Sequence, residues 1–272
     1  MPELPEVQTT IDGITPYLIN KTILKCTISV KKLRWELQKD IAKKIVNIKI
    51  TGITRRAKYI IISGENLYLT IHLGMTGTLR IANRNELKKK HDHFEIQLDS
   101  KVILRFNDPR KFGMIFYSTE SPLLTNRLFL NLGPEPLSKD FSAAYLYKAS
   151  KNRNVAIKSL LMNSKIVVGI GNIYASESLF LSKIRPDRIS KKLTKKNCED
   201  LVTSIKKVLK SAIKKGGSSI NDYINVDGKS GYFQYDFKVY GRTAKPCHIC
   251  QSDILQIKIN QRSSFYCKKC QR

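Results

Sequence analysis

The feature of this 272-residue sequence that most constrains its fold lies near the carboxyl end, where two cysteine pairs of identical spacing are separated by 16 residues. The four residues are Cys247, Cys250, Cys267 and Cys270. Two C-x2-C pairs at this separation are typical of a β-hairpin that supplies four thiolates to one tetrahedral zinc ion. Four thiolates leave no open coordination position, so the zinc would be structural, and its binding contributes on the order of 10–16 kcal/mol in comparable peptides. The sequence therefore predicts a terminal hairpin that one zinc ion folds, with almost no core of its own.

The sequence gives no sign of a membrane or secreted protein. No apolar stretch approaches the roughly 20 residues of a membrane span, and the first residues lack the apolar core of a signal peptide. We therefore expect a cytosolic protein without a membrane partner, in a reducing compartment where cysteines bind metals more often than they form disulfides. Cys26 and Cys198 stand alone and are interpreted as packing residues.

The sequence pattern changes from one typical of β-strands to one typical of helices at a cluster of prolines. Between Ile23 and Ser118, short β-branched and aromatic runs alternate with turn signals, which indicates a sandwich or barrel. The expected strands cover residues 23–30, 43–51, 58–63, 67–74, 93–98, 101–106 and 112–117. Residues 3–18 could form a short N-terminal helix. Helical spacing is found in residues 138–150, 153–163, 173–183 and 194–215. We expect a domain of residues 1–120, a linker at 121–137, a helical domain at 138–233 and a zinc finger at 238–272.

The charge of the chain points to a polyanionic partner. Lysine and arginine total 49 against 22 aspartates and glutamates, a formal net charge of +27. Such an excess favours nucleic acid as the partner, ahead of an anionic membrane surface. The alternative is a lysine-biased proteome, which runs such as Lys88-Lys89-Lys90 would fit.

The first residues, Met1-Pro2-Glu3-Leu4-Pro5-Glu6, combine two prolines with two acids. Pro5 suits the first turn of a helix, but the start of a helix does not explain Pro2. Removal of the methionine would expose the secondary amine of Pro2, whose reference pKa of about 8 leaves roughly a tenth of it neutral at pH 7. A neutral amine can attack a carbonyl-type carbon, and a secondary amine then forms an iminium that stays cationic. Glu3 and Glu6 could exchange protons beside it, although acids also simply favour a helix N-terminus.

Two other short segments suggest contacts with phosphate. Gly169-Ile170-Gly171-Asn172 lies between two expected helices, where Asn172 could cap the second helix and its free N–H groups could bind an anion. This pattern alone could also be only a turn between helices. Arg262 lies between the two cysteine pairs, where its guanidinium could bind a phosphate from the turn of the zinc hairpin.

Together these motifs resemble the formamidopyrimidine-DNA glycosylase family of base-excision repair enzymes. The resemblance extends from the first residue to the last. The matching segments are Pro2–Glu6, His72–Gly77, His91–His93, Asp108–Gly113, Gly169–Glu177, Asp227–Lys229, Val239–Arg242 and the cysteine hairpin ending at Gln271. The resemblance implies an α+β fold with an N-terminal helix and β-sandwich, a helical domain with a helix-two-turn-helix, and a C-terminal β-hairpin zinc finger. It also implies a monomeric enzyme of the bacterial cytosol that acts on double-stranded DNA.

By this resemblance the chain would be a bifunctional glycosylase and abasic-site lyase for oxidised purines, namely 8-oxoguanine and formamidopyrimidines. Pro2 would attack C1′ of the damaged nucleotide, and Glu3 would be the general acid that assists opening of the sugar ring. Lys58 matches the essential lysine of the β domain, and Arg262 would lie close to the elimination chemistry. Successive β- and δ-elimination would follow, with no organic cofactor.

The resemblance also assigns DNA-binding residues. Met75, Arg110 and Phe112 match the side chains that fill the space left by a flipped base, although without the family match Met75 and Phe112 would be taken as core and Arg110 as surface. The residues matched to the binding of phosphates or of DNA in general are His72, His91, Lys151, Arg153, Asn172 and Tyr240. A solvated surface explains Lys151 about equally well.

One departure from the family lies in the loop that would close over the flipped base, within residues 216–233. Asn221 stands where the family usually has a basic residue, which bears on how the loop selects 8-oxoguanine. Two alternatives remain: an endonuclease VIII-like enzyme for oxidised pyrimidines, and a non-catalytic zinc-containing DNA-binding protein. The segment Pro2-Glu3-Leu4-Pro5 and the set Met75, Arg110 and Phe112 argue against the first. The combination of Pro2, Glu3 and Lys58 argues against the second.

Overall fold

The computed structural model describes residues 2–218 and 236–272. Most of the expected loop at 216–233, with Asn221 and the Asp227–Lys229 motif, lies outside the described residues. The chain divides into two compact units, each of which is considered by itself. The first comprises residues up to Leu130 with the described residues 215–218. The second comprises residues 131–214 and 236–272.

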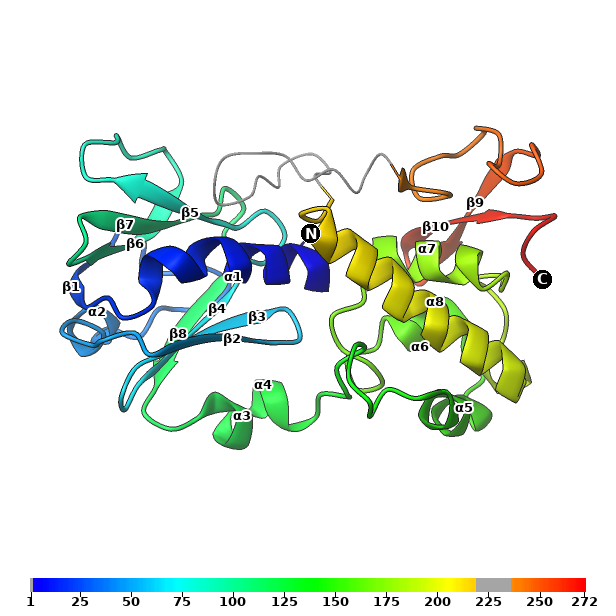
Figure 1. The fold of residues 1–272 in the computed structure, drawn as a ribbon, viewed down its shortest axis with the longest axis horizontal. Coiled ribbons are helices and arrows are strands. Elements are labelled where there is room, and N and C mark those ends of the chain that lie inside the picture. Colours follow the sequence, from blue (N-terminus) through cyan, green and yellow to red (C-terminus); the bar gives the residue numbers. More distant parts are fainter. Residues whose placement is uncertain (1, 219–235) are drawn as a thin grey trace. The chain divides into compact units, whose positions relative to one another are not determined.

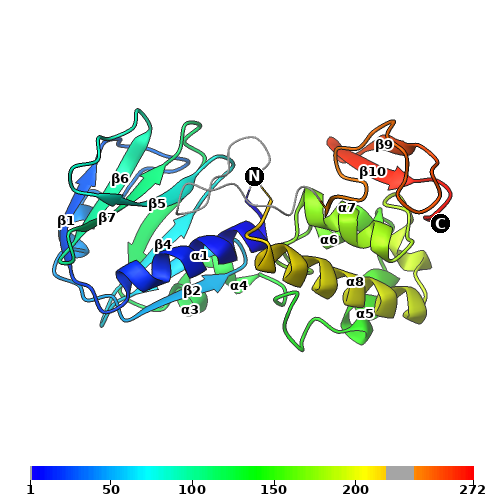
Figure 2. The same ribbon diagram turned by 45° about the horizontal axis from the view of Figure 1, so that its top comes forward.

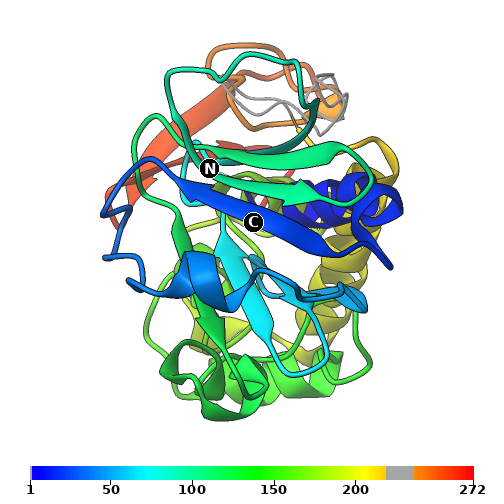
Figure 3. The same cartoon turned by 90° about the vertical axis from the view of Figure 1, so that its left-hand side faces the viewer.

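The first unit is a sandwich of two four-stranded antiparallel sheets (Figures 1 and 3). One sheet has the order β1-β6-β7-β5 and the other β2-β3-β4-β8. The strands are β1 (Ile23–Ile28), β2 (Gly52–Arg56), β3 (Tyr59–Ser63), β4 (Tyr68–His72), β5 (Thr78–Asn83), β6 (Asp92–Leu98), β7 (Val102–Asn107) and β8 (Met114–Ser118). Buried aliphatic and aromatic side chains from both sheets, such as Ile60, Ile71, Phe94 and Phe106, form one core.

Helix α1 (Leu4–Leu18) lies along one side of the sandwich, where it packs against strands β2, β3 and β5 (Figure 2). Its apolar face consists of Val7, Ile11, Ile14 and Leu18, which are buried and recur at helical spacing. Pro5 lies in the first turn, where its missing N–H removes no intrahelical bond. The expected N-terminal helix is therefore confirmed, and its burial fixes the direction of the chain at residues 2 and 3.

The strand expectations fail at two places in this unit. Residues 43–51 do not form a strand; helix α2 (Ile41–Lys44) precedes a turn there. Ile41 and Ile45 are both fully buried, and their spacing of four residues is that of one helical turn. Strands β2 and β5 were not expected, because each is an edge strand that carries arginines.

The second unit is helical, with a β-hairpin at its end. Residues 122–130, at the end of the first unit, form two short helices, α3 (Pro122–Thr125) and α4 (Arg127–Leu130). The second unit continues with α5 (Ala143–Lys151), α6 (Ile157–Leu161), α7 (Asn172–Leu181), the 3₁₀ turn η1 (Ser190–Lys192) and α8 (Lys195–Lys214). Helix α8 packs against α5 and α7 through its apolar face. No helix in the described part of the chain is long and apolar enough to cross a membrane.

The hairpin of the second unit joins β9 (Ile254–Ile259) to β10 (Arg262–Cys267). Asn260 and Gln261 form its two-residue turn with φ of 46° and 60°, the backbone that such a hairpin turn requires. The expected combination of sandwich, helical domain and cysteine-bearing hairpin is thus confirmed.

Candidate active site and metal centre

The N-terminal residues lie buried at the start of α1. Pro2 is buried, and Glu3 is the N-cap residue of the helix with only 2% of its surface exposed. The N–H of Glu3 donates to Oε2 of Glu6 at 2.8 Å, one half of a capping box. This bond fixes the backbone that immediately follows Pro2.

Glu6 holds a second segment through its other oxygen. Oε1 accepts from the N–H and the hydroxyl of Ser218, at 2.8 and 3.0 Å. Gly217 has φ of +78°, and a Cβ there would lie 3.1 Å from the same carboxylate oxygen. The Glu6 carboxylate therefore accepts hydrogen bonds on both oxygens and anchors two backbone segments.

Lys58 lies in the two-residue turn between β2 and β3, where Ala57 takes a φ of 55°. Arg55 supports this turn: its Nη1 donates to the carbonyl oxygen of Ala57 at 2.9 Å, and its Nε donates to Oε1 of Gln8 at 3.0 Å. Because Gln8 belongs to α1, one guanidinium joins the lysine turn to the helix that begins beside Pro2 and Glu3.

His72 is a neutral group in a cationic neighbourhood. Burial, and then the charges of Lys58 and Arg34, lower the pKa of His72 to about 4. Its Nδ1 accepts from the N–H of Gly74 at 3.0 Å, so the ring proton belongs to Nε2. At neutral pH His72 is therefore an uncharged donor with its orientation fixed.

A pocket of about 480 Å³ opens beside His72. It is lined by Leu33, Arg34, His72, Gly74, Met75, Lys111 and Phe112. The lining has two cations and no acid, which favours an anionic ligand. The sequence did not single out Arg34 or Lys111 as binding residues; Lys111 lies inside a recognised motif, whereas no local pattern marks Arg34.

Met75 and Phe112 are 40% and 41% exposed, so the alternative that they are core residues is wrong. The guanidinium of Arg110 lies over the ring of Phe112, 4.8 Å from its centroid. This cation–π contact keeps both side chains on one loop tip.

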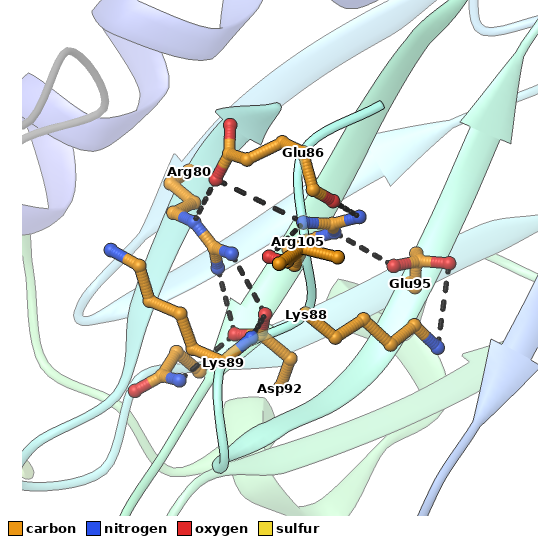
Figure 4. A network of polar contacts seen from close by, with 9 residues as sticks. Arg80, Glu86, Lys88, Lys89, Asp92, Glu95 and Arg105 are labelled. Atoms are coloured by element: carbon orange, nitrogen blue, oxygen red, sulfur yellow. Dashed lines mark hydrogen bonds and ion pairs between the residues drawn. The ribbon is translucent and has the colours of Figure 1, made fainter. Parts of the chain in front are cut away.

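His91 is held in place by the residue that follows it. Asp92 accepts from both Nη atoms of Arg80 at 2.7 Å each, from the side chain of Asn107 at 2.8 Å and from the N–H of Lys89 at 2.8 Å (Figure 4). Burial by itself would raise the pKa of Asp92, but the hydrogen bonds from Arg80 and Asn107 outweigh it and hold the pKa below its usual value. Figure 4 also shows the neighbouring pair Arg105 and Glu95, whose Nε and Oε2 are 2.7 Å apart. This network makes the segment around His91 rigid.

In the second unit, α7 and the hairpin are joined beside Arg262. The N-cap of α7 is Gly171 and not Asn172, so the expected cap is wrong. The Asn172 amide donates to the carbonyl oxygen of Ser263 at 3.1 Å instead. Lys158, with 1% of its surface exposed, donates to the same oxygen at 2.9 Å and to the hydroxyl of Ser264 at 2.7 Å. These donors fix the strand that begins at Arg262.

Tyr240 is positioned by Glu177 of α7. The buried Glu177 carboxylate accepts the N–H groups of Lys238, Val239 and Tyr240, at 2.8 to 3.0 Å. Burial raises the pKa of Glu177, and the three N–H groups act against that rise. The Tyr240 ring packs on Phe265 of the hairpin, with centroids 5.0 Å apart.

Lys151 and Arg153 lie exposed at the end of α5. Lys151 places its Nζ 4.3 Å from the centroid of the Tyr147 ring, and Nε of Arg153 donates to the carbonyl oxygen of Ala149 at 3.0 Å. Both are surface cations, and neither contact distinguishes DNA binding from a solvated surface.

The four hairpin cysteines form one cluster. Their sulfur atoms all lie within 4.8 Å of one another; the Cys247–Cys270 and Cys250–Cys267 pairs are 3.9 and 3.4 Å apart. A tetrahedral ion with Zn–S bonds of about 2.3 Å requires sulfur atoms about 3.8 Å apart. The donor set therefore fits a metal ion.

Comparison with known proteins places the chain among enzymes of DNA repair. The family model of the formamidopyrimidine-DNA glycosylase N-terminal domain matches residues 1–115, and that of the formamidopyrimidine-DNA glycosylase H2TH domain matches residues 132–223. The formamidopyrimidine-DNA glycosylase of Haemophilus influenzae (strain PittEE) is 47% identical over 272 residues, which covers 100% of this chain and 99% of the relative. The corresponding enzyme of Pasteurella multocida is 45% identical, with both chains fully covered.

Solved structures agree. A complex of a Lactococcus lactis Fpg variant with DNA containing Fapy-dG has a TM-score of 0.93 at 32% identity, with both chains fully covered. The MutM (Fpg) protein from Thermus thermophilus has a TM-score of 0.88 at 31% identity, covering 99% of this chain and 98% of that one. With both family models matched and identity spread over the whole length, the chain belongs to the formamidopyrimidine-DNA glycosylase family.

Proposed function

We propose that this chain excises oxidised purines from double-stranded DNA and then cleaves the resulting abasic site, with Pro2 as the nucleophile. The observation that carries the proposal is the support of the N-terminus: Glu6 fixes the backbone after Pro2, and Arg55 joins α1 to the turn that bears Lys58. This support fixes the backbone that carries the Pro2 amine, as a nucleophile that must approach C1′ from one direction requires.

In the proposed reaction the neutral amine of Pro2 attacks C1′ of the damaged nucleotide and the bond from C1′ to the base breaks. The amine loses its proton and the departing base gains one, so the step is balanced. Opening of the sugar ring leaves a cationic iminium, and Glu3 donates a proton to the departing ring oxygen. The iminium acidifies the adjacent C2′ proton, so loss of that proton expels the 3′ phosphate by β-elimination. A second elimination, which we assign to the neighbourhood of Arg262, expels the 5′ phosphate. Lys58 holds a backbone phosphate.

The same proposal gives roles to the other matched residues. Met75, Arg110 and Phe112 would fill the space left by the flipped base, which offsets part of an unstacking cost of a few kcal/mol. The exposed tips of Met75 and Phe112 and the contact of Arg110 with Phe112 support this role. The neutral His72 would donate from Nε2 to a phosphate, and Asn172, Tyr240, His91, Lys151 and Arg153 would bind the DNA backbone.

We infer that the cysteine cluster holds zinc. Cys247, Cys250, Cys267 and Cys270 supply four soft ligands, which select zinc over the oxygen-seeking Mg²⁺ and Ca²⁺. The ion would fold the hairpin and take no part in the reaction, because four thiolates occupy all its positions.

Oxidised pyrimidines are the alternative lesion class. One Lactococcus lactis Fpg structure is described as a complex with DNA containing an oxidised pyrimidine, at a TM-score of 0.92 and 32% identity. Asn221, which lies outside the described residues, is where this chain departs from the family in the loop expected over the base. Excision of 8-oxoguanine compared with thymine glycol distinguishes the two classes. Monomeric action and a bacterial cytosolic location stay predictions.

Borohydride trapping tests the nucleophile. Borohydride reduces an iminium to a stable amine, so the protein with Met1 removed should be trapped on a duplex that contains 8-oxoguanine. Pro2→Gly should lose most trapping, because glycine supplies only a primary amine, and protein that retains Met1 should lose it entirely. Undiminished trapping by Pro2→Gly would identify another nucleophile, and no trapping by the processed protein would favour the non-catalytic DNA-binding alternative.

A further inference from the structure

Two loops of the first unit carry the three side chains proposed to enter the DNA. Residues 73–77 join β4 to β5, and residues 108–113 join β7 to β8. Strands β4 and β8 are neighbours in one sheet, and β5 and β7 are neighbours in the other. Both loops therefore cross from one sheet to the other beside each other. The two ladders end at the pairs His72 with Met114 and Thr78 with Asn107, so no sheet pairing joins the loops themselves.

A single buried carboxylate joins them instead. Asp108 has none of its surface exposed. Its Oδ1 accepts from the hydroxyl of Thr76 at 2.8 Å, and its Oδ2 accepts from the N–H of Gly113 at 2.7 Å. One oxygen thus holds the loop with Met75, and the other closes the loop with Arg110 and Phe112. Hydrogen bonds to an ionised acceptor are about twice as strong as neutral ones.

The backbone of Asp108 is fixed as firmly as its side chain. Its N–H donates to the carbonyl oxygen of His91 at 3.0 Å, and its own carbonyl oxygen accepts from Nε2 of His93 at 3.1 Å. That oxygen also accepts from the N–H of Lys111 at 3.2 Å. The backbone that carries the carboxylate is therefore attached to His91 and to His93 of β6, beside the Asp92 network.

The two loops also touch without spare room. Gly74 has φ of +67°, and a Cβ there would lie 2.6 Å from the carbonyl oxygen of Phe112. A Cβ on Gly113 would lie 3.1 Å from Oδ2 of Asp108. A shift of either loop would consequently displace the other or break a bond to the carboxylate.

We propose that Asp108 is a positioning residue that couples the Met75 loop to the Arg110–Phe112 loop, so that the three side chains enter the space of a flipped base as one unit. The coupling fixes the spacing between Met75 and the Arg110–Phe112 pair before DNA is bound. Insertion then costs little conformational entropy, because the loops do not have to be ordered one after the other. The entry of these three side chains into DNA rests on the proposed function.

The hydroxyl of Thr76 offers a sharp test, because it can be removed with little change of shape. Thr76→Val deletes the donor to Asp108, whereas Thr76→Ser keeps it. Thr15→Val is the matched control in the same unit, since the Thr15 hydroxyl only bonds the carbonyl oxygen of Ile11 within α1, at 2.6 Å. Single-turnover rates are measured for base excision at 8-oxoguanine paired with cytosine and for strand cleavage at a preformed abasic site.

Loss of one charge-assisted hydrogen bond should slow excision by Thr76→Val roughly tenfold. Cleavage at the abasic site should slow less than about threefold, because no base has to be unstacked there. Thr76→Ser and Thr15→Val should stay within about twofold of the wild type for both reactions. A merely structural role would slow both reactions equally, so the ratio of the two rates reports positioning.

Three results would overturn the inference: equal slowing of both reactions, a Thr76→Ser variant as slow as Thr76→Val, or unchanged excision by Thr76→Val. An inactive wild type would instead contradict the proposed function. The coupling is then tested without activity, from amide NMR signals of residues 110–113. These signals should shift in Thr76→Val and not in Thr15→Val, and their constancy would sink the proposal.

Discussion

Lys58 and Arg262, the two cations proposed to act beside the reacting sugar, both occur at β-hairpin turns, and the two hairpins are stabilised by different means. The Lys58 turn joins two strands of a sandwich with a continuous apolar core behind it. Arg55 closes the turn by donating to Ala57 and ties it to Gln8 of α1. The Arg262 hairpin has only two strands, a small buried cluster and four cysteines. Lys158 and Asn172 hold the strand directly after Arg262.

The comparison shows that a positioned cation needs a fixed backbone but not a large core. A two-stranded hairpin is marginally stable by itself, so a metal ion and buried donors from neighbouring helices replace the missing sheet. The Lys58 turn inherits its rigidity from the sandwich, and the hydrogen bonds of Arg55 reinforce it locally. Perturbations should therefore act more strongly on the Arg262 hairpin than on the Lys58 turn.

Removal of the metal should produce the largest difference between the Arg262 hairpin and the Lys58 turn. A chelator, or Cys267→Ser, removes a contribution on the order of 10 kcal/mol to the folding of the hairpin. Affinity for damaged DNA should fall more than about a hundredfold, while the sandwich keeps its β-sheet circular dichroism. Cys26→Ala, outside the cluster, is the control and should keep one zinc per chain by elemental analysis. Unchanged DNA affinity after complete loss of metal would contradict the assignment of the hairpin to DNA binding.

Lys158→Met tests the helix support of the Arg262 hairpin without touching the cysteines. It leaves the Ser263 carbonyl oxygen with one donor fewer and removes the donor to Ser264, which should cost about 2–3 kcal/mol of stability. The melting temperature and the rate of strand cleavage should both fall, with zinc content unchanged. Lys195→Met, an exposed lysine at the start of α8, should change neither quantity. If the two variants melt alike, the buried lysine does not hold the hairpin.

Arg55→Met tests the corresponding support of the Lys58 turn. The variant loses the bonds to Ala57 and Gln8 and keeps the strand pairing, so about 1–2 kcal/mol of stability should be lost. Because the turn rests on the sandwich, the turnover number should fall roughly fivefold with little change in KM. Lys43→Met, on the exposed side of α2, is the control. A larger loss of stability in Arg55→Met than in Lys158→Met would reverse the comparison.

The sequence predicted those parts whose cause is local. The cysteine hairpin follows from ligand spacing, and the start of α1 follows from Pro5, which suits the first turn of a helix. Strands β2 and β5 were not predicted because they are edge strands with charged residues, such as Arg55 and Arg80, which interrupt the alternation of apolar residues. Residues 43–51 were taken for a strand because isoleucines at helical spacing also satisfy a β-branched composition.

The candidate site divides in the same way. The motif residues were found along the chain, but their supports were not, because each support joins distant segments. Examples are Asp108 with Thr76, Glu6 with Ser218, and Lys158 with Ser263. Arg34 was missed for this reason as well: only folding brings it to the pocket beside His72. Asn172 was read as a helix cap because the turn was visible in the sequence, whereas its hydrogen-bond partner in the hairpin was not.

The smallest effect expected is that of Arg262→Ala, which leaves the hairpin intact and removes only its cation. Arg262 is exposed at the first position of β10, so its loss should cost little stability. If it binds a phosphate, affinity for damaged and undamaged duplex should fall alike, by roughly fivefold, and the slope of log K against log salt should lessen by about 1. Lys191→Ala, an exposed lysine in η1, is the control for a general loss of charge. A loss of affinity confined to damaged DNA would show that Arg262 reads the lesion, and the comparison with Lys58 as two phosphate-binding turns would then fail.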